Sequence, residues 1–192
     1  MAHNPRAANP SASVPRILDR LAAEKKLTRE QYDAVVLHFR REGGAVDEAI
    51  IDALGLSESD VLKMLAAVHK TRFVASEKLA SAAITAQLLN LVPRKLAERA
   101  TVLPVLIDNQ TATLSVVTPD PENVQVLEEV RLTSRARDVK AFVGRTLAIK
   151  AAIAKLYAGD ATLFAAFEEI VRRGTWRHTP SAGFQAITTA LS

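Results

Sequence analysis

The chain has 192 residues, of which 48% are hydrophobic and 24% charged, as in an ordinary globular protein. It contains no cysteine, which excludes disulfides, thiolate metal sites and cysteine nucleophiles and favours a reducing cytoplasm. The 25 basic residues exceed the 21 acidic ones only mildly and are spread along the chain, so we expect solvated helix surfaces rather than a nucleic-acid interface.

The N-terminal stretch 1–14 is rich in Ala, Pro, Asn and Ser and lacks the apolar run of a signal peptide. Such a composition buries too little apolar surface to offset chain entropy, so we expect a disordered leader. No stretch approaches the ~18 apolar residues of a membrane span. These features predict a cytoplasmic protein without direct membrane insertion.

The stretch 15–70 has helical periodicity throughout. Thr28 and Gln31 match a capping box, and Ser57 is the N-cap signal of a later helix. Gly43 and Gly55 are typical of helix ends. We therefore predict a helical subdomain of four helices in two pairs.

The stretch 71–158 mixes strand and helix signals. Beta-rich runs at 101–107 and 111–117 flank a tight hairpin loop, and 72–74 and 139–143 are further strand candidates. Helices are expected at 85–91, 93–99, 121–132 and 146–157, the third with Asp120 as its N-cap. The predicted fold class is α+β, with a small α/β subdomain whose sheet has three or four strands.

The C-terminal stretch 159–192 is predicted to be an amphipathic helical tail. Its apolar side chains fall on one helix face, which we regard as a candidate partner-binding surface: Leu163, Phe167, Ile170 and Val171.

Three segments carry a resemblance to a known family. The segments 91–97 (LVPRKLA), 100–105 (ATVLPV) and 114–121 (LSVVTPDP) resemble, in order and spacing, the N-terminal domain of type II secretion and type IV pilus assembly ATPases. That family is also described as a cyclic-di-GMP-binding N-terminal domain. The resemblance covers roughly residues 15–157 and implies a regulatory or docking role beside a motor.

The motor itself has no signature in this sequence. A phosphate-binding loop needs the pattern G-x-x-x-x-G-K-[ST], and none of the seven glycines begins or completes it. We therefore expect a chain that is not an enzyme.

Members of the family that bind cyclic di-GMP do so through tandem helical motifs, each with a leading Arg-Leu-Gly and a later Gly before a Ser/Thr cap. The resemblance implies that the best candidates for such a site are Arg16 and Leu27 in the first copy, and Gly55 and Leu56 in the second.

The same motifs also depart from the family pattern. Leu18 and Lys25 stand where glycines belong, Phe39 where glutamine is common, and Ala45 replaces the second arginine. A Cβ at a glycine position blocks close approach of the backbone to a ligand. We therefore expect no cofactor, with cyclic di-GMP as the one candidate ligand.

Other chemistry has little support. The four histidines fit no metal-ligand spacing, and adjacent carboxylates such as Glu128 and Glu129 point ~100° apart on a helix. The stretch 48–70 allows a helix-turn-helix reading, but its second helix presents Glu58 and Asp60 on the expected exposed side, which suits phosphates poorly.

The sequence thus predicts a non-catalytic docking or regulatory module. Its expected partner is a protein, either a secretion or pilus motor ATPase or the inner-membrane platform of that machine. Two alternatives stay open: a cyclic-di-GMP receptor using the tandem helical motifs, and a DNA-binding helix-turn-helix module.

Overall fold

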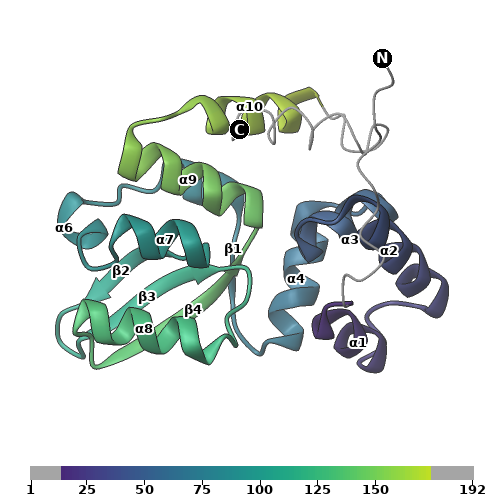
Figure 1. Cartoon of the computed structure of the whole chain (residues 1–192), viewed down its shortest axis with the longest axis horizontal. Coiled ribbons are helices and arrows are strands. Elements are labelled where there is room, and N and C mark those ends of the chain that lie inside the picture. The colour runs from purple at the N-terminus through teal and green to yellow at the C-terminus, as the bar shows by residue number, and fades with distance from the viewer. Residues whose placement is uncertain (1–13, 174–192) are drawn as a thin grey trace, which may run out of the picture.

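The computed structural model describes residues 14–173 (Figure 1). The predicted leader before Val14 and the predicted tail beyond Arg173 lie outside the described residues. The chain has the predicted α+β architecture, in which four helices are followed by a sheet with helices packed against it. Figure 1 shows the four N-terminal helices on one side of the molecule and the sheet on the other.

The N-terminal helices begin and end where local signals place them. They are α1 (Arg16–Ala23), α2 (Arg29–Glu42), α3 (Val46–Leu54) and α4 (Glu58–Val68). Thr28 and Gln31 form the predicted capping box at α2, and the Ser57 hydroxyl accepts the Asp60 N–H at the start of α4. Gly43 and Gly55 follow the last residues of α2 and α3, as predicted.

The sheet is mixed, with strand order β1-β4-β3-β2. Its strands are β1 (Phe73–Val74), β2 (Leu103–Asp108), β3 (Thr113–Thr118) and β4 (Asp138–Gly144). Strands β2 and β3 form the predicted antiparallel hairpin, whereas β4 is parallel to both β3 and β1. Strand β1 is an edge strand, and its residue Phe73 packs against the hydrophobic cluster of the N-terminal helices.

Six further helices accompany the sheet within the described part of the chain. They are α5 (Ser76–Ser81), α6 (Ala86–Leu89), α7 (Arg94–Ala100), α8 (Val124–Ser134), α9 (Thr146–Ala158) and α10 (Thr162–Arg173). Helix α5 was not expected from the sequence. No helix between residues 14 and 173 has the length and apolar character needed to cross a membrane.

The predicted start of α8 was wrong. Asp120 does not cap the helix, because its carboxylate accepts the Glu122 N–H in a local turn. The helix begins three residues later than predicted, where the Asn123 side chain accepts the Val126 N–H.

Buried side chains form two hydrophobic clusters. One lies among the four N-terminal helices and includes Leu18, Ile50 and Val61. The other lies between the sheet and its helices and includes Val116 and Ile149. Val143 of β4 belongs to the first cluster, so the sheet contributes directly to the core of the helical subdomain. We use "helical subdomain" for residues 14–70 and "α/β subdomain" for residues 71–173.

Candidate functional site

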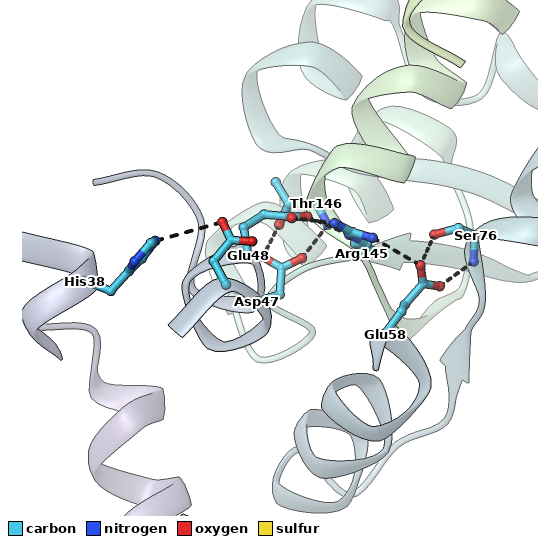
Figure 2. A network of polar contacts seen from close by, with 8 residues as sticks. His38, Asp47, Glu48, Glu58, Ser76, Arg145 and Thr146 are labelled. Carbon is cyan, nitrogen blue, oxygen red and sulfur yellow. Dashed lines mark hydrogen bonds and ion pairs between the residues drawn. The ribbon is translucent and has the colours of Figure 1, made fainter. Parts of the chain in front are cut away.

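A buried polar network joins the two subdomains. It consists of Asp47, Glu48, Glu58, Ser76, Arg145 and Thr146, and we call it the junction network (Figure 2). The first three residues belong to α3 and α4. Ser76 begins α5, Arg145 lies between β4 and α9, and Thr146 begins α9. Each hydrogen bond of the network joins a residue of the helical subdomain to a residue of the α/β subdomain.

Arg145 is the centre of the junction network and is only 1% exposed. It lies between the end of β4 and the start of α9. Its Nε and Nη2 donate to the two carboxylate oxygens of Glu48, at 2.7 and 2.6 Å, and its Nη1 lies 3.5 Å from Glu58. Paired N–H groups facing a carboxylate make a strong, directional contact, which suits a fixed junction.

The Asp47 carboxylate caps helix α9 from outside that helix. Arg145, the residue before α9, provides no side-chain cap. Instead, Asp47 accepts the Thr146 N–H at 2.6 Å and the Thr146 hydroxyl at 2.7 Å. A carboxylate at a helix N-terminus satisfies an unpaired N–H and interacts favourably with the helix dipole. Helix α9 thus depends on α3 for its first hydrogen bonds.

Helix α5 is capped in the same way. The residue before it, Ala75, has no side chain that could serve. Glu58 of α4 accepts the Ser76 N–H at 2.9 Å and the Ser76 hydroxyl at 2.8 Å. Glu58 was predicted to lie on an exposed helix face. It is instead engaged in the junction, because the first residue of α5 lies against the first residue of α4.

Burial dominates the electrostatics of the Glu48 and Arg145 pair. Desolvation raises the pKa of Glu48 to about 7, although the hydrogen bonds and charge of Arg145 act to lower it. Desolvation also acts to lower the pKa of Arg145, but the hydrogen bonds and charge of Glu48 outweigh it and leave that pKa above its ordinary value. Arg145 therefore stays charged, and Glu48 is the group that can titrate.

A histidine and aspartate pair lies beside this network in the helical subdomain. His38 of α2 and Asp52 of α3 approach to 3.9 Å. Desolvation raises the pKa of Asp52, against the lowering effects of His38 and Arg145. The charge of Arg145 is thus felt one helical turn beyond Glu48.

A second polar contact joins the subdomains at another place. Glu122, in the connection between β3 and α8, pairs with Arg20 of α1 and lies 3.4 Å from Nδ1 of His69. Arg20 also donates to the Val68 carbonyl at 2.7 Å. The two junctions hold the helical subdomain against the sheet at separate points.

The polar groups of the junction network bind one another and so hold the two subdomains together. The buried charged side chains of the described residues, Asp47, Glu48 and Arg145, all have partners within the junction network. Between residues 14 and 173, no group of three or more His, Asp or Glu side chains is arranged to hold a metal ion. The network can fix the relative position of two subdomains, and that is the role its geometry supports.

The structure does not bring the four sequence-derived ligand candidates into one polar site. Arg16 is exposed at the first residue of α1, and Leu27 is buried in the helical cluster, against which Leu56 also packs. Gly55 has a left-handed φ of +62°, and a Cβ there would meet nothing within 4 Å. Their role in ligand binding stays a prediction.

The proposed partner face on α10 is described only in part. Leu163 is buried in the cluster of the α/β subdomain. The side chains of Phe167, Ile170 and Val171 lie outside the described set. The face they were predicted to form therefore stays a prediction.

No local pattern in the sequence indicates the junction network. Arg145 and Glu48 are 97 residues apart, and nothing local pairs them. The one hint lies at α9, whose predicted start at Thr146 is preceded by Arg145, a residue that provides no side-chain cap.

Comparison with known proteins agrees with this architecture. Residues 77–163 match the MshEN domain family. The structure of MshE with cdg is similar with a TM-score of 0.57 and 18% identity, covering 75% of this chain and 100% of that one. The N-terminal domain of XpsE is similar with a TM-score of 0.50 and 20% identity, covering 79% and 96% respectively. No curated protein sequence matches. The match at residues 77–163 and the two similar structures confirm the resemblance to the N-terminal domains of secretion and pilus ATPases that the sequence predicted.

Proposed function

We propose that this chain is a non-catalytic, cytoplasmic docking or regulatory module that binds a protein of a secretion or pilus machine. One observation carries the proposal. The buried charged groups Asp47, Glu48 and Arg145 join the subdomains to each other, so the fold uses them to preset a rigid shape. A catalytic site would instead direct perturbed acids or bases into a cleft.

A preset shape favours binding, because little conformational freedom is then lost on association. The match to the MshEN domain family at residues 77–163 supports the choice of partner, since the resemblance implies a place beside a motor ATPase. We therefore propose the motor ATPase or its inner-membrane platform as the protein bound.

The test uses the purified full chain mixed in turn with the motor ATPase and with the cytoplasmic part of the platform protein. Light scattering after size exclusion should show a complex with one of them. The variant Glu48→Ala, which removes one side of the junction, should weaken that complex, while the surface variant Asp33→Ala should not. Absence of a complex with either protein at tens of micromolar contradicts the proposal, as does ATP hydrolysis by the chain alone.

A cyclic-di-GMP receptor is the second candidate, favoured by one backbone feature. The solved MshE structure is that of MshE with cdg, an abbreviation for this dinucleotide. Lys25, at a position where the ligand-binding motif has glycine, has a left-handed φ of +56°. The turn therefore keeps a glycine-like backbone, closed by the Lys26 N–H donating to the Leu21 carbonyl at 2.8 Å. At this one position, the added side chain is the difference from glycine.

This feature gives a direct test by calorimetry with cyclic di-GMP. If the chain is a receptor, it binds as it stands, Lys25→Gly tightens binding, and Arg16→Ala weakens it at least tenfold. Arg29→Ala is the matched control, because Arg29 is an exposed arginine that lies on α2 rather than α1 and pairs with Asp33 of the same helix. If neither the wild type nor Lys25→Gly gives binding heat with cyclic di-GMP, the receptor hypothesis is contradicted. Leu18 is unsuitable for such restoration, because it is completely buried in the helical cluster.

A further inference from the structure

A hollow of about 500 Å³ opens on one face of the sheet and is lined by residues of α5 and of the β2–β3 hairpin. The strand register builds its floor. Ser115 of β3 pairs with Leu106 on one side and with Lys140 on the other, so these three side chains share one face. Phe142, two residues further along β4, extends the same face. Leu106 is 62% exposed, although it lies in a strand.

Three cations surround this apolar floor, each from a different element. Arg72 is the residue before β1, and its guanidinium lies 5.5 Å from the centre of the Phe142 ring. The Lys140 Nζ lies 5.8 Å from the same ring, and Lys78 comes from α5. Contacts of this kind hold cations over an aromatic face without neutralising them.

The hollow does not contain the negative charge needed to balance these cations. Within residues 14–173, none of Arg72, Lys78 and Lys140 pairs with a carboxylate at ion-pair distance. Asp108 is the single acidic residue of the lining, and its carboxylate accepts from Thr111 and from the Gln110 N–H. An approaching carboxylate would therefore be attracted by three like charges that at present repel one another.

The shape and charge together indicate a protein segment as the occupant. The hollow is open to solvent and its floor is largely apolar, whereas small-molecule sites bury most of their ligand. Arginine and aromatic side chains at an apolar patch are typical of the centre of a protein interface. The chain's own stretches 1–13 and 174–192 contain no Asp or Glu, so neither supplies side-chain carboxylates.

We infer that this hollow is the docking site for an acidic segment of a partner protein, in which carboxylates flank an apolar or aromatic side chain. The apolar side chain lies on Leu106 and Phe142, and its acidic neighbours pair with Arg72, Lys78 and Lys140. This inference rests on the proposed docking function and locates the surface that performs it.

The test uses the full ¹⁵N-labelled chain and the end-blocked peptide Asp-Asp-Phe-Glu-Leu-Asp-Asp. Adding the peptide should shift the amide resonances of Leu106, Lys140 and Phe142, and added salt should weaken binding. Arg72→Glu with Lys140→Glu should reduce the affinity at least tenfold, and Lys78→Glu alone should reduce it less. Lys26→Glu, a charge reversal of an exposed lysine in the helical subdomain, should leave it unchanged.

Several results would overturn the inference. They are equal binding of a peptide with Asn and Gln in place of its acids, shifts confined to other regions, or unchanged affinity in the double variant. Displacement of the peptide by inorganic pyrophosphate at lower concentration would make the hollow a small-anion site instead. Shifts that depend on protein concentration without peptide would indicate a second copy of this chain.

The same variants separate this inference from the proposed function. If Arg72→Glu with Lys140→Glu still forms the complex with the motor or platform protein, docking stands and the hollow is not its site. If even the wild type forms no complex, the proposed function fails, whatever the peptide does.

Discussion

Arg145 and Glu48 lie 97 residues apart in sequence and are joined in the interior by two hydrogen bonds of 2.7 and 2.6 Å. The arginine belongs to the α/β subdomain and the glutamate to the helical one. Each charge is buried, so each depends on the other for compensation. The pair thus makes the folding of one subdomain depend on the placement of the other.

The first prediction concerns the loss of one member of this pair. Glu48→Ala removes the two shortest hydrogen bonds of the buried Arg145 guanidinium and should lower the free energy of unfolding by about 3–5 kcal/mol. Replacing both with apolar residues, Glu48→Leu with Arg145→Met, should cost less than Glu48→Ala alone. Urea denaturation measures both. A loss below about 1 kcal/mol in the single variant would show that the pair contributes little.

The second prediction concerns the cap of α9. Asp47→Ala removes both hydrogen bonds to Thr146 and should lower the free energy of unfolding by about 1.5–3 kcal/mol. Asp47→Asn keeps an acceptor and should cost less. The surface aspartate Asp33 is the matched control, because its exposed pair with Arg29 predicts a change within about 0.5 kcal/mol for Asp33→Ala. Equal losses for Asp47→Ala and Asp33→Ala would contradict the capping role.

These caps also explain what could be predicted from sequence. The starts of α2 and α4 were predicted correctly, because Thr28 and Ser57 cap them from the adjacent position. Helix α5 was missed because its cap, Glu58, is 18 residues away in another helix. The hairpin could be foreseen from the turn residues after Asp108, whereas the parallel pairing of β1 with β4 depends on contacts between distant segments.

The junction network could not be predicted from the sequence, because it too depends on contacts between distant segments. The sequence-based candidates came from a motif at Arg16 and Gly55, whereas the junction network consists of charges scattered between residues 47 and 146. Periodicity reports which helix face is apolar, and it carries no information on which buried acid meets which distant base.

The third prediction concerns pH and follows from the raised pKa of Glu48, about 7 in the folded state against an ordinary value of 4.5. Between these values the folded state keeps a proton that the unfolded state has lost. The contribution of this group to stability is therefore complete below about pH 4.5 and is lost as the pH rises through 7.

Comparison with Glu48→Gln isolates this effect, because the other titrating groups are common to both proteins. The stability of the wild type relative to Glu48→Gln should fall as the pH rises from 5 to 7.5 in urea denaturation series. A difference that is constant across this range would mean that Glu48 keeps its ordinary pKa, and a rising difference would mean that Arg145 has lowered it.

The fourth prediction concerns Gly144, at the end of β4. A Cβ at this position would lie 2.3 Å from Cγ1 of Val117 and 3.1 Å from Cδ1 of Ile149, so the strand passes too close to β3 and α9 for any side chain. Gly144→Ala should lower the free energy of unfolding by about 1–3 kcal/mol through overpacking. Because the closest contact is with Val117, adding Val117→Ala should recover part of that loss. Calorimetric unfolding of the two single variants and the double variant measures the coupling, and losses that simply add would show that Val117 is not the obstacle.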